Sequence, residues 1–155
     1  MTPILEGTLK GSGKKIGIVI SRFNEFITQR LLTGCLEELK KQGVKSNQIP
    51  IAWVPGSMEL SIVALKLARK KNIDAVICLG AILRGDTFHF ELVAYGTTSG
   101  IVQAGLMTGK PVIFGVLSTD TIDQAYQRSQ AKGYNKGRDA ARNALEMIDL
   151  LSQIK

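Results

Sequence analysis

Four runs of mostly apolar, often β-branched residues alternate along this chain with longer segments of helical periodicity. The runs cover residues 15–21, 49–54, 75–83 and 111–117. Such nearly continuous apolar runs are typical of parallel strands that are buried on both faces. Apolar residues three and four positions apart predict helices at residues 25–42, 58–71, 89–108 and 136–151, with a shorter one that is capped by residues 118–121 and runs to Arg128.

Strands that alternate with helices favour right-handed crossovers and one parallel sheet with helices on both faces. The chain is therefore predicted to be an α/β protein, a flavodoxin-like three-layer sandwich around a four-stranded parallel sheet in the order 2-1-3-4. Pro50, at the start of the second strand, favours an edge position for that strand. We expect residues 1–155 to form a single domain, with an N-terminal arm strand at Ile4–Leu9 that Gly11-Ser12-Gly13 separates from the rest.

The turns after the four strands are the first place to look for a site, because ligands bind at the carboxyl ends of parallel strands. These turns are residues 22–24, 55–57, 84–87 and 117–121. His89, the only histidine, follows the third of them, and an imidazole that titrates near neutrality suits proton transfer. An isolated histidine can equally cap a helix or pack in a core, so its position alone leaves both interpretations open.

Other side chains near these turns have an ordinary and a functional interpretation. Phe23 either packs against the following helix or offers its ring face to a planar ligand. Glu59 suits the first turn of any helix, and Arg128 suits the last turn of one. Lys136 is less ordinary, because a cation at a helix N-terminus opposes the helix dipole. Arg128 and Lys136 could together hold a phosphate, or both could belong to a solvated face.

The formal net charge of +7 is compatible with nucleic acid, a membrane surface or an anionic substrate. Nucleic acid is not expected as a partner, because exposed aromatics interleaved with the basic residues and known reading motifs are absent. No apolar run is long enough to span a membrane, and the first residues lack signal-peptide features, so we expect a soluble, cytoplasmic protein without membrane contacts. Cys35 and Cys78 are expected to be buried and free, and the sequence has no zinc-ligand spacing, so no metal is expected.

Several blocks, read together, closely resemble the lumazine synthase family (6,7-dimethyl-8-ribityllumazine synthase). They occur in the order and spacing of that family across nearly the whole chain. The blocks are Arg22-Phe23-Asn24, Val54 to Glu59, Leu79 to Phe90, Phe114 to Leu117, Asn135-Lys136-Gly137 and Glu146-Met147.

The resemblance implies an enzyme of riboflavin biosynthesis that uses no metal or redox cofactor. Its reaction would condense 5-amino-6-ribitylamino-uracil with 3,4-dihydroxy-2-butanone 4-phosphate to 6,7-dimethyl-8-ribityllumazine, releasing phosphate and water. Imine formation, phosphate elimination and ring closure are mostly proton transfers. The alternative is a lumazine or flavin carrier on the same scaffold that binds without catalysis.

The resemblance also implies roles for individual residues. His89 would transfer protons, with Arg128 and Lys136 completing the catalytic set. The pyrimidine would lie on Phe23, near Phe114, with its edge against the backbone of Ala81, Ile82 and Leu83. The ribityl chain would contact Ser57, Met58 and Glu59. The phosphate would bind Gly85, Asp86, Thr87 and Arg128, with the Asp86 side chain turned to solvent or to Arg84.

Active sites of this family lie between the subunits of a pentamer, and some members assemble pentamers into an icosahedral 60-mer. The arm at Ile4–Leu9 could add to a neighbour's sheet in such an assembly. The chain departs from shell-forming members at Gln130 and Tyr134, where those members carry glycine, so pentamer and 60-mer both stay open. Phe88 and Met58 depart from the residues that are usual in the family at their positions.

Overall fold

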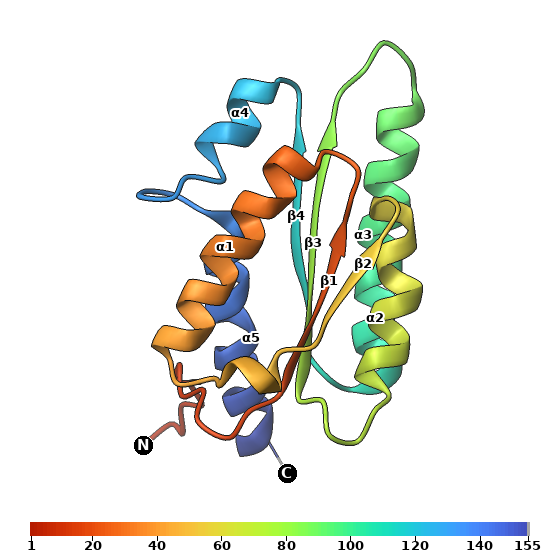
Figure 1. Cartoon of the computed structure of the whole chain (residues 1–155). Helices are drawn as coiled ribbons and strands as arrows, with labels where there is room; N and C mark the ends of the chain where they lie inside the picture. Colours follow the sequence, from red (N-terminus) through yellow and green to blue (C-terminus); the bar gives the residue numbers. More distant parts are fainter. Residues whose placement is uncertain (155) are drawn as a thin grey trace.

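Four parallel strands form the centre of the structure, a computed structural model that describes residues 1–154 (Figure 1). Their order is β2-β1-β3-β4, which confirms the predicted order 2-1-3-4 and the edge position of the second strand. The strands are β1 (Ile16–Ser21), β2 (Ile51–Val54), β3 (Ala75–Leu83) and β4 (Val112–Thr119).

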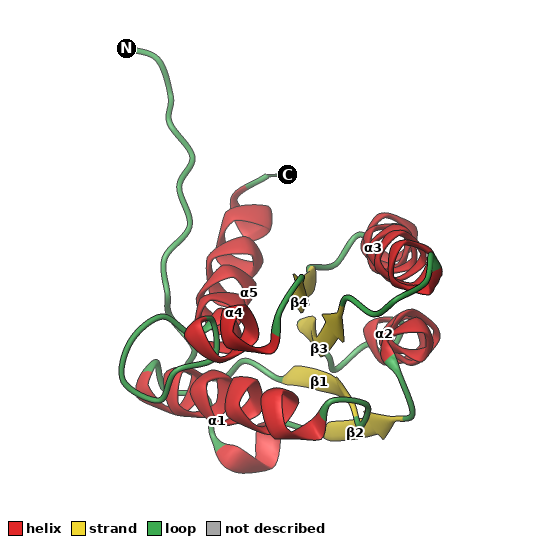
Figure 2. Cartoon of the chain, turned by 90° about the horizontal axis from the view of Figure 1, so that it is seen from above, coloured by secondary structure: helices red, strands yellow, loops and turns green. Residues whose placement is uncertain are grey.

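Helices cover both faces of this sheet and make three layers (Figure 2). On one face lie α1 (Glu25–Lys41), α4 (Ile122–Gln127) and α5 (Lys136–Gln153), and on the other lie α2 (Leu60–Ala68) and α3 (His89–Thr108). Two short 3-10 helices, η1 (Ser46–Gln48) and η2 (Ser57–Glu59), flank β2. Each face of the sheet carries its own apolar core. Within the described chain, no helix is long and apolar enough to cross a membrane.

Several element boundaries differ by one to three residues from those predicted, and two of these differences have a clear cause. The second helix ends at Ala68 instead of residue 71, where the Lys110 ammonium group donates to the carbonyls of Lys70 and Ile73 at 2.7 Å each. The fourth strand runs on to Thr119, because residues 118–119 pair with the last two residues of β3. The cap of α4 is Thr121, whose hydroxyl accepts from the N–H of Gln124 at 3.2 Å.

The predicted N-terminal arm strand is not evident: within residues 1–154, residues 4–9 pair with no strand. Side chains of α5 hold this segment instead, since the N–H of Thr8 donates to Asp149 at 2.8 Å and Gln153 donates to the carbonyl of Glu6 at 2.8 Å. The segment therefore lies on α5 and adds no strand to the sheet of its own chain. The Thr8 contact also lowers the pKa of Asp149.

The strands end at different heights, and this stagger exposes one side of β3. Pairing between β1 and β3 ends at Ile20 and Leu79, whereas residues 80–83 pair only with β4. Backbone groups of β3 that would face β1 beyond this point have no strand partner. An edge of polar backbone therefore opens at the carboxyl end of the sheet, where sites form in such folds.

Candidate active site

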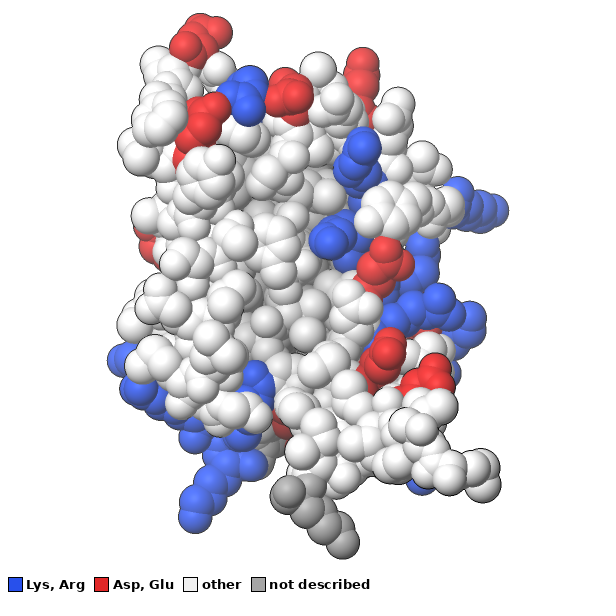
Figure 3. Space-filling view, turned by 180° about the vertical axis from the view of Figure 1, so that it is seen from behind, with Lys and Arg blue, Asp and Glu red and all other residues white. Residues whose placement is uncertain are grey.

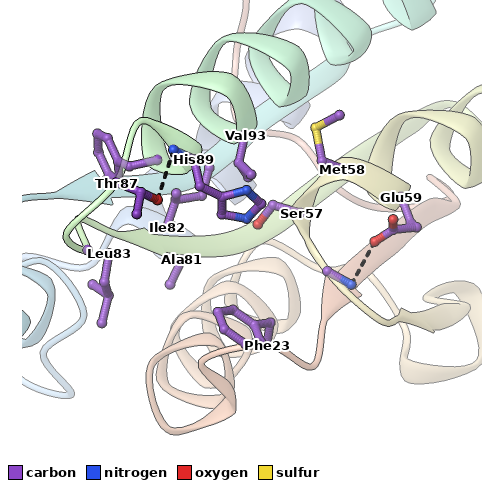
Figure 4. Close-up of a pocket in the computed structure, with 13 residues that line it drawn as sticks. Phe23, Ser57, Met58, Glu59, Ala81, Ile82, Leu83, Thr87, His89 and Val93 are labelled. Carbon is purple, nitrogen blue, oxygen red and sulfur yellow. Dashed lines mark hydrogen bonds between the residues drawn. The ribbon is translucent and has the colours of Figure 1, made fainter.

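A cavity of about 420 Å³ lies at this exposed end of β3 (Figure 4). It brings together ten of the residues that the sequence proposed, from the first three turns at the carboxyl ends of the strands. The lining residues are Phe23, Gly56, Ser57, Met58, Glu59, Ala81, Ile82, Leu83, Gly85, Thr87, His89, Phe90 and Val93.

The floor of the cavity is the free backbone edge of β3. Ala81 and Ile82 are buried, so the cavity meets mainly their backbone. The carbonyl of Ala81 already accepts a hydrogen bond from the side chain of Asn24 at 2.7 Å. Asn24 takes a left-handed conformation with φ 60° just before α1, a conformation that asparagine tolerates better than most residues. The first turn is thus tied to the floor, and the remaining backbone groups can read the edge of a planar ligand.

Phe23 stands at the open side of the cavity with 71% of its surface exposed. Its backbone N–H donates to the carbonyl of Pro55 at 3.0 Å, which fixes the turn although the ring is outside the core. A large aromatic ring that is exposed to water contributes little hydrophobic stabilisation to the fold. The geometry therefore favours an exposed ring face that can stack on a flat ligand.

Ser57, Met58 and Glu59 reach the cavity from η2. Ser57 is 6% exposed, and Gly80 makes room for it, since a Cβ at Gly80 would lie 2.8 Å from the Ser57 hydroxyl. The Glu59 carboxylate accepts from the N–H of Gly56 at 2.9 Å, so Glu59 plays the ordinary role of a helix-start residue and also lines the cavity. A hydroxyl and a carboxylate that line the same cavity suit a polyhydroxylated chain.

His89 is the first residue of α3, and Figure 4 shows its imidazole directed toward the cavity, across from Phe23. Its backbone N–H donates to the hydroxyl of Thr87 at 3.3 Å, just before the helix begins, and the His89 side chain caps no helix in the described chain. No residue within 1–154 forms a hydrogen bond with the ring nitrogens of His89. The imidazole is therefore free to exchange a proton with a bound molecule.

Four residues of the predicted site lie outside this cavity. Asp86 is exposed and turned to solvent, since Arg84 pairs with Glu91 and Asp120 instead. Phe114 is half-buried on β4 against the core beneath α2 and α3. Arg128 and Lys136 also lie elsewhere, and the Arg128 guanidinium donates to the carbonyl of Gln124 at 3.1 Å. Within one chain, Arg128 thus has the ordinary role of an arginine at the end of a helix.

Arg128 and Lys136 nevertheless lie next to each other. The N–H of Lys136 donates to the carbonyl of Arg128 at 2.9 Å, and Ser129 and Asn135 form an antiparallel bridge inside the loop that these two residues close. Asn135 is 2% exposed, donates to the carbonyls of Arg30 and Gln130, and accepts from two N–H groups at the start of α5. The fully bonded asparagine fixes the loop, so the backbones of Arg128 and Lys136 are held next to each other.

Three lining residues were missed from the sequence: Gly56, Phe90 and Val93. Val93 lies one helical turn after His89, so helical spacing alone would have placed it on the same face of α3. Gly56 belongs to a turn that the sequence analysis had singled out. Phe90 closes the block Leu79 to Phe90 but was given no role; the guanidinium of Arg84 lies over its ring at 4.3 Å from the ring centre.

On the molecular surface around the cavity, charged and apolar side chains occupy different areas. Figure 3 shows the face between α3 and α5 as a broad, hollowed, mostly uncharged surface, with basic side chains gathered along its α5 side. On α3, large apolar side chains are exposed at Leu92, Tyr95, Val102, Leu106 and Met107. Exposed apolar surface of this extent marks an interaction site.

Cysteine and metal chemistry find no support near the cavity. Cys35 and Cys78 are buried and free, as predicted, and burial raises the pKa of the Cys78 thiol to about 12. Such a thiol is not a nucleophile at neutral pH. Among residues 1–154, no group of three or more His, Cys, Asp or Glu side chains could hold a metal ion. A second cavity, between the N-terminal segment and α5, has a polar lining of both charge signs that includes Lys136.

Comparison with protein families agrees with this geometry. A family model described as 6,7-dimethyl-8-ribityllumazine synthase matches residues 13–152. The match runs from just before β1 to the last turn of α5 and includes every residue that lines the cavity.

Proposed function

The chain belongs to the 6,7-dimethyl-8-ribityllumazine synthase family, a transferase family of riboflavin biosynthesis, and we propose that it catalyses the reaction for which the family is named. It condenses 5-amino-6-ribitylamino-uracil with 3,4-dihydroxy-2-butanone 4-phosphate and releases phosphate and water. One observation carries the proposal: the cavity combines an exposed aromatic ring at Phe23, a free backbone edge on β3 and the free imidazole of His89.

The pyrimidine substrate occupies the part of the cavity between Phe23 and β3. Its ring stacks on Phe23, and backbone groups of Ala81, Ile82 and Leu83 bind its polar edge. The free side of β3 supports this assignment, because unpaired backbone donors and acceptors need a partner. Ser57 and Glu59 bind the ribityl hydroxyls, and Met58, which packs against Gly96, forms an apolar wall.

The phosphorylated substrate binds beyond His89. Backbone N–H groups of Gly85 and Asp86 and the hydroxyl of Thr87 contact its phosphate, and the Asp86 carboxylate stays in solvent. Arg128 supplies a planar fork and Lys136 a point charge. Because these two cations lie away from the cavity of their own chain, they reach the phosphate from a neighbouring copy.

His89 moves the protons of the reaction. The amine attacks the ketone and one water is lost to form an imine, the phosphate is eliminated, and ring closure with loss of a second water completes the lumazine. Each step needs a proton donor or acceptor within hydrogen-bond distance, which the free imidazole provides. Arg128 and Lys136 stabilise the charge on the leaving phosphate.

The neighbouring copy also brings Phe114 to the pyrimidine and completes the site. The uncharged face between α3 and α5, with its exposed apolar side chains on α3, supports an interface between copies. A head-to-tail arrangement closes into a ring, and we propose a pentamer. The closed loop between Arg128 and Lys136, with Gln130 and Tyr134 where shell-forming members have glycine, favours pentamers over the 60-mer.

The two free cysteines agree with a reducing compartment such as the cytoplasm.

Turnover distinguishes this enzyme from a carrier on the same scaffold. The test is to mix the purified protein with both substrates and to follow the absorbance of the lumazine. The proposal expects a linear increase of product with time, many molecules per subunit. Tight binding of the lumazine without any product formation would support the carrier instead.

A further inference from the structure

Arg84 connects two turns that lie next to each other at the carboxyl end of the sheet. It is the first residue after β3, and its side chain donates from Nε to Asp120 at 2.6 Å and from Nη1 to Glu91. Asp120 follows β4, and Glu91 lies in the first turn of α3. The guanidinium also lies over Phe90, which lines the cavity. One side chain therefore holds the start of α3 against the end of β4.

The segment between Arg84 and His89 has few other restraints. Its contact with the rest of the sheet is the N–H of Arg84, which donates to the carbonyl of Thr119 at 2.9 Å, and the bond from His89 to Thr87 is internal. A Cβ on Gly85 would meet nothing within 4 Å. Such an open segment keeps its shape only if its ends are fixed.

We propose that Arg84 is a positioning residue that sets the orientation of His89 and of the segment 85–87 toward the cavity. The inference rests on the proposed function, because it treats His89 as the proton-transfer group. Arg84 acts through two contacts with the residues directly after His89: the stacking on Phe90 and the ion pair with Glu91. A fork-shaped guanidinium can make both contacts and bind Asp120, which a lysine cannot.

Two other roles fit the geometry less well. A direct phosphate ligand would need free donors and a positive surrounding, but Arg84 lies between two carboxylates, so the cluster of three carries a net negative charge. A role in stability alone is also a weak explanation, because the three side chains are partly exposed, at 43%, 25% and 63%, and exposed ion pairs contribute little to folding.

The test compares R84Q with R142Q in the full-length protein. Arg142 is the matched control, because it also pairs with a carboxylate, Glu38, at 3.1 Å, but on the opposite face of the sheet. We expect R84Q to lower kcat about tenfold, with the KM for the pyrimidine substrate changed less than twofold. R142Q should keep kcat within twofold, and R84K should recover only part of the loss.

A double-mutant cycle then separates positioning from substrate binding. If Arg84 acts through its carboxylates, E91Q/D120N should reproduce the loss in kcat, and adding R84Q to that variant should cost little more. Should R84Q fail to fold, the E91Q/D120N variant tests the same contact. A higher KM for the phosphorylated substrate in R84Q, absent from E91Q/D120N, would make Arg84 a direct ligand and overturn the proposal.

A readout that needs no turnover keeps this inference separate from the proposed function. His89 is the only histidine, so its imidazole gives a single set of NMR signals in the full-length protein. R84Q should shift or broaden these signals, whereas R142Q should leave them unchanged. If R84Q changes neither the His89 signals nor kcat, the positioning role is overturned. If the wild-type protein shows no turnover but R84Q still changes the His89 signals, only the proposed function is overturned.

Discussion

The backbone N–H of Lys136 donates to the carbonyl oxygen of Arg128 over 2.9 Å, which locks the end of α4 to the start of α5. The loop between them is closed by the bridge from Ser129 to Asn135. The backbones of two basic residues that are separate in the sequence therefore meet at this point. An arginine fork and a lysine point charge are the combination that suits a phosphate.

The first prediction concerns this cation pair. Replacing Arg128 by alanine should raise the KM for the phosphorylated substrate about 10- to 100-fold, because a charge-assisted hydrogen bond contributes about 1.5–3 kcal/mol. The KM for the pyrimidine substrate should change little. Steady-state kinetics with each substrate varied in turn measures both values.

Lys132→Ala is the control for this prediction, since it removes an exposed cation from the same loop. It should leave both KM values within twofold of the wild type. An Arg128→Ala variant that behaves like Lys132→Ala would contradict the phosphate role of Arg128.

The second prediction concerns the imidazole in the cavity. His89→Ala should slow turnover by about ten- to a thousandfold, because it removes the positioned proton donor and acceptor. Binding of the pyrimidine substrate, measured by calorimetry, should stay nearly unchanged, since Phe23 and the edge of β3 remain. Turnover at the wild-type rate would exclude His89 from the mechanism.

The third prediction tests whether the site is shared between copies. His89→Ala and Arg128→Ala chains, each weakly active alone, should regain activity when they are co-expressed. In a head-to-tail ring, about one interface in four then combines an intact His89 with an intact Arg128 from the neighbour. If the co-expressed mixture is no more active than the two variants separately, each site lies within one chain.

Local patterns in the sequence were enough to predict the layers of the fold and the exact first and last residues of two elements. Apolar, β-branched runs predicted β3 at residues 75–83, and small and apolar residues predicted α3 at residues 89–108. These elements follow from burial and helical periodicity, which neighbouring residues encode. The position of the cavity was predicted for the same reason, from the turns after the strands, whereas most of its individual residues were named only through the family resemblance.

Contacts between distant parts of the chain could not be predicted in this way. Asp86 was expected to face solvent or Arg84 and is exposed, but nothing in the local sequence indicated that Arg84 pairs with Asp120 at the end of the neighbouring strand. The arm at residues 4–9 has the composition of a strand but lies on α5. In both cases the partner depends on which elements the fold brings together, and this is a property of the whole topology.

The fourth prediction concerns stability in acid. Burial alone would raise the pKa of Glu38, but hydrogen bonds from Gln42 and Arg142 hold the pKa below its ordinary value of 4.5. A pKa that is lower in the folded state stabilises the fold above about pH 4.5, and this stabilisation is lost as the pH falls below it. Glu38→Gln should therefore lower the Tm at pH 7 by about 2–4 °C and lower it less at pH 3.

Glu37→Gln is the control for Glu38. The Glu37 side chain is 62% exposed and lies 3.7 Å from Arg138, so its replacement should leave the pH dependence of the Tm unchanged. Thermal unfolding of the three proteins between pH 3 and 7 makes the comparison. Parallel curves for wild type and Glu38→Gln would show that Glu38 contributes nothing to acid sensitivity.

The most direct measurement of the central claim follows both products of one reaction at the same time. With both substrates present, lumazine absorbance and inorganic phosphate should increase together, one phosphate for each lumazine. The rate of both should fall together in His89→Ala. Phosphate released without lumazine, or neither product formed while the pyrimidine substrate binds, would contradict the assignment of the cavity as the site of this condensation.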